Sequence, residues 1–114
     1  MQDLNEDKIQ EIVIDFEEWR SKKLDEGIYS SMGAIIKMTL DSMFGVGFLP
    51  MNLRVKGTQR EVDSFIGALG SEKRYIQSAR DFGLNSPRTY KNKNFLNNAV
   101  KGFEKATGLK WPFK

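Results

Sequence analysis

The sequence predicts an α+β fold, with two N-terminal helices, then a strand–helix–strand(–strand) segment, and a C-terminal helix packed on a small sheet. Apolar residues recur at intervals of three and four over most of the chain, which is typical of amphipathic helices. They alternate with polar residues over two or three short segments, which is typical of half-buried strands. Since the elements come in runs rather than in strict alternation, we expect the helices to cover one face of the sheet.

Two helices are expected in the first half of the chain. Residues 5–25 follow an Asp3–Glu6 capping box and place apolar side chains at helical spacing until Gly27. The other face of this helix carries an acidic stripe, formed by Asp7, Glu11, Asp15 and Glu18. The second helix, over 32–44, is apolar around more than half of its circumference and rich in methionine. It is therefore either a central core helix or a surface for a protein partner.

A strand and a capped helix are expected next. Residues 49–56 alternate between apolar and polar, which predicts a strand with its basic side in water. Gly57 then turns the chain, and Thr58 with Glu61 forms a capping box that begins a short helix. We expect this helix to end at Gly70.

The last third is expected to hold one or two further strands and a helix. Residues 74–80 alternate moderately, and 88–91 are expected to pair with them as a hairpin across the loop at 81–87. The final helix begins near Asn92 or Asn94 and ends at Gly108. A tail, Trp111–Phe113, follows it and is expected to be able to fold back as a lid.

The bulk composition favours one domain over residues 1–114, with any subdivision at 45–47, where the charge and the periodicity change. The chain has no cysteine and no histidine, so it lacks thiolate chemistry, the usual metal ligand and the usual general base. We expect no enzyme activity, no cofactor and no metal site. The first 20 residues lack a signal-peptide pattern, and the longest apolar stretch is interrupted by charges, so a cytoplasmic protein without a membrane partner is expected.

The charge of the chain is divided in two. Residues 1–49 contain ten Asp and Glu against five Lys and Arg, whereas residues 50–114 contain five against thirteen. A basic segment of this kind indicates a polyanion or an acidic protein surface as its partner.

The candidate nucleic-acid site is the set of basic and aromatic residues that the expected sheet would bring together. Cations neutralise phosphates and tyrosines stack on unpaired bases, so this set favours single-stranded DNA or RNA over duplex. Its members are Arg54, Lys56, Arg74, Tyr75, Arg80, Arg88, Tyr90, Lys91 and Lys93.

Three alternatives stay open at this point. The basic residues can form a plain solvated face. The chain can instead be a protein-interaction module or inhibitor that binds through Asp7, Glu11, Asp15 and Glu18, or through the methionine-rich helix. The oppositely charged halves can also pair head to tail between two copies, so the oligomeric state is open, as are the strand order and the ligand.

One segment resembles a known group of proteins. The run Val55-Lys56-Gly57-Thr58, followed by Glu61, Val62 and Phe65, is similar to the opening of small ferredoxin-like accessory proteins encoded by bacteriophages. The resemblance covers 30 to 40 residues and implies a small binding module, whose partner is a host protein, a phage protein or DNA.

Overall fold

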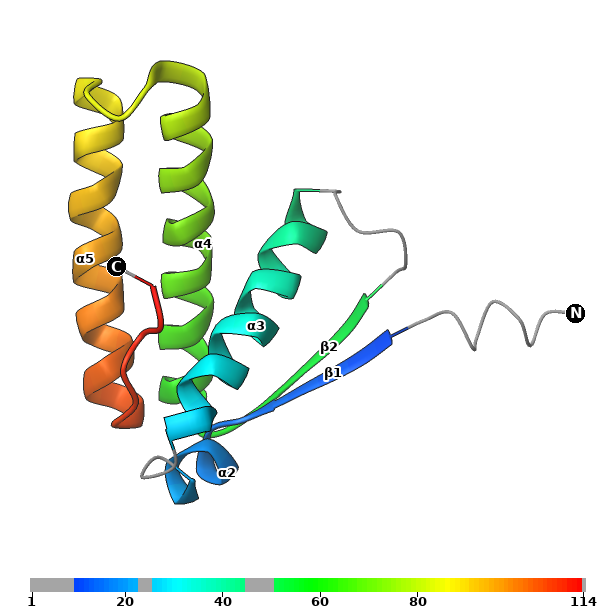
Figure 1. Cartoon of the computed structure of the whole chain (residues 1–114). Helices are drawn as coiled ribbons and strands as arrows, with labels where there is room; N and C mark the ends of the chain where they lie inside the picture. The colour runs from blue at the N-terminus through cyan, green and yellow to red at the C-terminus, as the bar shows by residue number, and fades with distance from the viewer. Residues whose placement is uncertain (1–9, 23–25, 45–50, 114) are drawn as a thin grey trace, which may run out of the picture. The chain divides into compact units, whose positions relative to one another are not determined.

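The structure, a computed structural model, describes residues 10–22, 26–44 and 51–113 (Figure 1). It divides the chain into two compact units, Met1–Gly57 and Thr58–Lys114, and each is described by itself below. The division falls at Gly57, later than the predicted subdivision at 45–47, which lies outside the described residues. The chain is a mixture of helices and strands, as predicted, but the helical part is larger and the sheet smaller than expected.

The first unit is built on two parallel strands. Strand β1 (Gln10–Asp15) pairs with β2 (Met51–Lys56), with Ile12 opposite Leu53 and Asp15 opposite Lys56. Helices α2 (Phe16–Ser21) and α3 (Glu26–Met43) lie between them in the sequence. Parallel strands cannot be joined by a tight turn, so the helices form the crossover that returns the chain to the same end of the sheet.

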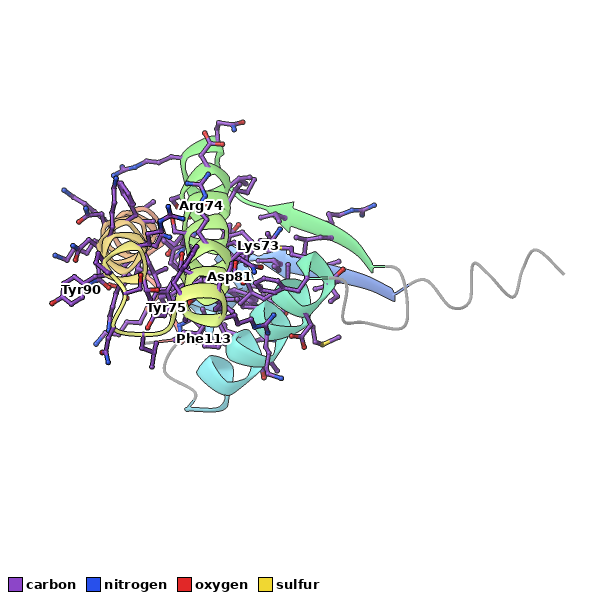
Figure 2. The ribbon with its side chains drawn as sticks, turned by 90° about the horizontal axis from the view of Figure 1, so that it is seen from above. Lys73, Arg74, Tyr75, Asp81, Tyr90 and Phe113 are labelled. Carbon is purple, nitrogen blue, oxygen red and sulfur yellow. The ribbon has the colours of Figure 1, made fainter. Side chains whose placement is uncertain are left out.

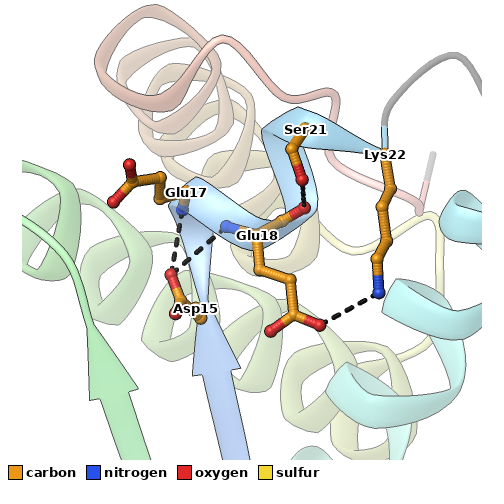
Figure 3. A network of polar contacts seen from close by, with 5 residues as sticks. All are labelled: Asp15, Glu17, Glu18, Ser21 and Lys22. Atoms are coloured by element: carbon orange, nitrogen blue, oxygen red, sulfur yellow. Dashed lines mark hydrogen bonds and ion pairs between the residues drawn. The ribbon is translucent and has the colours of Figure 1, made fainter.

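The predicted helix over residues 5–25 is wrong. Residues 10–15 form a strand, and the helix that follows contains only six residues. Ile12, Val13 and Ile14 are β-branched and favour strands, and the burial alternates, since Ile12 and Ile14 are buried whereas Val13 is 40% exposed. Asp15 then caps α2, because its carboxylate accepts hydrogen bonds from the backbone N–H of Glu17 and Glu18 at 3.1 and 3.3 Å (Figure 3).

The other two predictions for the first unit are confirmed in outline. The helix predicted over 32–44 is present as α3, which begins earlier, at Glu26. Its side chains Met32, Ile36 and Leu40 are buried, at the four-residue spacing of one helix face. The strand predicted at 49–56 is present as β2, although its first two predicted residues lie outside the described residues.

The second unit is an antiparallel pair of long helices, α4 (Gln59–Phe82) and α5 (Pro87–Thr107), which run side by side (Figure 1). The predicted capping box begins α4, because the Thr58 hydroxyl accepts from the Glu61 N–H at 3.2 Å and the Glu61 carboxylate accepts from the Thr58 N–H at 2.8 Å. Helix α5 begins with Ser86 as its N-cap and Pro87 in its first turn, and Gly108 ends it with a φ of +76°.

The strands predicted at 74–80 and 88–91 are wrong, and so is the helix end predicted at Gly70. Helix α4 continues through Gly67 and Gly70, and residues 88–91 form the first turn of α5. Each glycine costs a helix about 1 kcal/mol relative to alanine, but Phe65, Leu69 and other buried side chains of α4 offset this through packing. The C-terminal helix therefore packs on another helix rather than on a sheet, and the basic sheet surface that the sequence predicted does not form.

The core of the second unit is an aromatic cluster that includes the tail. After α5 the chain turns back along the hairpin, and Trp111 packs against Phe103 and Phe65 with ring centroids 5.2 and 6.2 Å apart. The indole N–H of Trp111 donates to the Glu72 carboxylate at 2.9 Å, and its backbone N–H donates to Glu104 at 3.0 Å. The tail is thus part of the folded core of this unit.

Gly83 has a backbone conformation that other residues rarely adopt, with a φ of +85° and a ψ of 162°. We expect Gly83→Ala to lower the free energy of unfolding by about 1–3 kcal/mol, measured by urea denaturation. Gly67→Ala is the matched control, because Gly67 is helical and a Cβ there meets no atom within 4 Å. It should raise the free energy of unfolding by about 0.5–1 kcal/mol. A higher free energy of unfolding in both variants would show that the loop does not depend on this conformation.

Candidate nucleic-acid interface

Seven of the nine predicted nucleic-acid-binding residues lie near one end of the helical hairpin. The last turns of α4, the loop 83–86 and the first two turns of α5 are adjacent there, and we call residues 73–93 the hairpin end. Helix α4 contributes Arg74, Tyr75 and Arg80, and α5 contributes Arg88, Tyr90, Lys91 and Lys93. The other two, Arg54 and Lys56, are exposed on β2 of the first unit.

Contacts between the two helices fix the shape of the hairpin end. The Thr89 hydroxyl, which is 1% exposed, donates to the Gly83 carbonyl oxygen at 2.7 Å. The Asn92 side-chain amide donates to the Ser78 hydroxyl, so the chain is tied across the hairpin one turn further in. These bonds hold the first turns of α5 in register with the last turns of α4.

Two of the predicted cations lie over aromatic rings. The Arg88 guanidinium carbon is 4.8 Å from the centroid of Phe82, and the Lys93 ammonium is 6.0 Å from the centroid of Tyr75. A ring face attracts a cation and limits the conformations of a long side chain. The rings of Phe82 and Tyr75 therefore restrict the conformations of Arg88 and Lys93.

The two tyrosines differ in how open their rings are. Tyr90 is 69% exposed, and in Figure 2 it points away from α4 on the outer side of α5. Tyr75 is half-buried, with Lys93 over its ring. Of the two tyrosines, only Tyr90 presents an open ring for a base, so one of the two predicted stacking candidates remains open.

The carboxylates of the second unit accept hydrogen bonds from other groups of the same unit. Residues 58–114 contain eleven Lys and Arg against five Asp and Glu. Glu61 belongs to the capping box of α4, and both Glu72 and Glu104 accept hydrogen bonds from Trp111. The two exposed ones accept from glutamine side chains one turn away, Asp63 from Gln59 and Asp81 from Gln77. By this count the side chains of residues 58–114 carry a net charge of +6 (11 − 5), and the exposed Asp63 and Asp81 keep their negative charge at the surface.

Glu72 is a described group whose titration clearly departs from the ordinary. Burial raises the pKa of its carboxyl, and the hydrogen bond from the Trp111 indole opposes this in part. A raised pKa can mark a catalytic acid, but Glu72 faces an aromatic core and anchors the tail. Among the residues that the structure describes, no three side chains of the metal-binding types gather in one place.

The predicted acidic stripe does not form. Asp7 lies outside the described residues, and Glu11 belongs to strand β1 rather than to a helix. Asp15 is occupied in capping α2, and the Glu18 carboxylate pairs with the Lys22 ammonium at 3.0 Å (Figure 3). These residues share no helix face, because a strand and a helix meet at Asp15.

One further feature of α5 was not singled out from the sequence. Five polar residues follow each other at steps of three and four on its exposed side, and we call them the outer face of α5: Lys91, Asn94, Asn98, Lys101 and Lys105. This spacing could have been recognised, because most of these residues lie within the helix that the sequence predicted from Asn92 or Asn94 to Gly108.

In comparisons with protein-family models, curated proteins and solved structures, no match to this chain was found. The resemblance to phage accessory proteins stays a prediction. None of the described helices combines the length with the apolar character that crossing a membrane requires.

Proposed function

We propose that this protein is a small non-enzymatic module that binds nucleic acid through the helical hairpin of its second unit. The observation that supports this most is the charge balance of the hairpin. Arg74, Lys91, Lys101 and Lys105 form no ion pair with any described residue, while the carboxylates of the same unit are engaged in internal hydrogen bonds. A nucleic acid suits such a surface, because the lysines and arginines can neutralise the phosphates of its backbone.

The aromatic side chains of the hairpin end also fit a nucleic-acid partner. Tyr90 offers an open ring between the cations of Arg88, Lys91 and Lys93 on the first two turns of α5. A ring beside cations can contact a base or a sugar while the cations hold phosphates.

The proposal is tested by fluorescence anisotropy with labelled single-stranded DNA, duplex DNA and duplex RNA, each at 50 and 200 mM salt. We expect binding to at least one of them, with affinity falling on the order of 10²–10³-fold between the two salt concentrations if about five phosphates are contacted. No binding at 50 mM salt, or an affinity that does not change with salt, would contradict the proposal.

A second candidate function is supported by helix α3. Met38 and Met43 are 40% and 38% exposed, whereas Met32 of the same helix is buried. Exposed methionines adapt to irregular apolar surfaces, which supports a protein-interaction module or inhibitor. A stoichiometric protein partner that is retained after nuclease treatment, and lost in the Met38→Lys variant, would favour this function over the first.

A further inference from the structure

The outer face of α5 has a composition that helix stability does not explain. All five of its residues are exposed, and neither Asn94 nor Asn98 forms a hydrogen bond with another described residue. Asparagine is among the poorer helix formers, costing about 0.6 kcal/mol relative to alanine at each exposed position. Helix α5 carries Asn97 as a third exposed asparagine beside them. These asparagines lower the stability of the helix, and no hydrogen bond to a described residue compensates for this. Such residues indicate a role in binding.

We propose that the outer face of α5 lies in the major groove of duplex DNA and reads base edges there. Asn94 and Asn98 contact the bases, and Lys91, Lys101 and Lys105 contact phosphates on the groove walls. This inference rests on the proposed function, and it specifies which nucleic acid the hairpin binds and which helix recognises it.

The charge of the face fits this partner. Its three lysines form no ion pair with described residues, and none of its five positions carries a carboxylate that would repel a phosphate. Lysines stand at both ends and asparagines in between, so the cations flank the groups that can read a base. In a groove, the phosphates of the two strands likewise flank the base edges.

The dimensions of the helix fit the groove of B-form DNA. An α-helix with its side chains is about 10–12 Å across, and the major groove is about 12 Å wide. The face extends for about 21 Å along the axis, at about 1.5 Å per residue. The major groove of A-form RNA is too deep and narrow to admit a helix, and a single strand offers no groove for a helix to enter.

The chemistry of asparagine suits adenine. A side-chain amide can accept from the N6 amino group and donate to N7 at the same time, and each such pair discriminates by about 1–3 kcal/mol against the wrong base. Asn94 and Asn98 are one turn apart, about 6 Å along the helix, which is close to two base-pair steps. We therefore expect a preferred site that contains adenines about two base pairs apart.

The test uses the full chain and a library of 20-base-pair duplexes with a randomised centre. The wild-type protein should enrich an adenine-containing motif. For the variant Asn94→Ala/Asn98→Ala, the preference for this motif over a scrambled duplex should fall by about 10–100-fold. Its affinity for the scrambled duplex should stay within about twofold, because the phosphate contacts are intact. Alanine is the better helix former, so the variant should fold at least as well.

The control and the contrary results are distinct. Asn85→Ala removes an exposed asparagine from the loop of the hairpin end and should leave the preference unchanged. Enrichment of no motif, tighter binding to single strands or RNA, or a double variant with full preference would each overturn the groove-reading role while the nucleic-acid function stands. Binding to none of the probes would contradict the proposed function itself.

Discussion

Replacing Trp111 by alanine is expected to lower the free energy of unfolding by about 3–5 kcal/mol, the largest effect on stability of any single change considered for this chain. The side chain is 4% exposed and packs against Phe65, Phe103 and Phe113. Its removal leaves a cavity between the helices of the hairpin. It also leaves the Glu72 carboxylate buried without its donor, which adds a desolvation cost to the lost packing.

Urea denaturation followed by circular dichroism measures this effect. Two further variants separate the contribution of the hydrogen bond from that of packing and provide a control. Trp111→Phe keeps a ring but removes the indole N–H, so its loss should be about 1–3 kcal/mol. Phe95→Ala is the control, because Phe95 is 52% exposed on α5, and its change should stay within about 0.5 kcal/mol. If Trp111→Ala cost less than 1 kcal/mol, the tail would not be part of the core in solution.

The variant Glu72→Gln separates the effect of the Glu72 charge from the effect of its hydrogen bond to Trp111. The glutamine oxygen can still accept from the Trp111 indole, but it carries no charge to desolvate. Burial raises the pKa of Glu72 in the fold, so the folded state holds its proton more tightly than the unfolded state does. The contribution of Glu72 to stability is therefore greatest below the usual pKa of glutamate and falls as the pH rises through the raised pKa. The glutamine variant should lack this part of the pH dependence and gain stability relative to wild type at neutral pH.

Removing four cations from the hairpin is expected to weaken nucleic-acid binding on the order of 10³-fold at 0.1 M salt. The variant is Arg74→Gln/Lys91→Gln/Lys101→Gln/Lys105→Gln, chosen because these residues form no ion pair with described residues, so no carboxylate loses a partner. Each phosphate contact contributes through the release of a condensed counterion, by about one unit in the slope of log K against log salt. The slope should thus become shallower by about three to four units.

The control compares pairs of substitutions. Lys101→Gln/Lys105→Gln and Lys22→Gln/Lys37→Gln remove the same charge, but the second pair lies in the first unit, where Lys22 and Lys37 contact Glu18 and Asp41. We expect the first pair to reduce the salt slope by about two units and the second to leave it nearly unchanged. Equal effects of the two pairs would mean that net charge alone, and no particular surface, drives binding.

Local signals in the sequence predicted some elements of this fold well. Helix α3, strand β2 and the capped start of α4 were recognised, because a run of apolar residues, an alternation and the Thr58–Glu61 box each lie within a few residues of the element they specify. Strand β1 was missed because its partner is distant in the sequence. The spacing of Ile12, Val13 and Phe16 suits a helix as well as a strand, so only the pairing with β2 decides between them.

The length of α4 could not be predicted because Gly67 and Gly70 are ordinary signals for a helix end. The packing of the hairpin outweighs them, and packing cannot be read from a window of sequence. For the candidate interface, the sequence identified residues that the hairpin end does bring near each other, but on helices rather than a sheet. It overlooked Asn98, Lys101 and Lys105, whose common face becomes evident once the helix is projected along its axis.

The central claim is that nucleic acid contacts the hairpin of α4 and α5, and amide chemical-shift mapping of the 15N-labelled full chain tests it most directly. On addition of a 20-base-pair DNA duplex at 50 mM salt, we expect the largest shifts at Arg74, at residues 88–94 and at Asn98, Lys101 and Lys105. The amides of β1 and α3 should move little. Spectra that stay unchanged at an excess of duplex DNA, single-stranded DNA and duplex RNA alike, or shifts confined to residues 10–57, would contradict the claim.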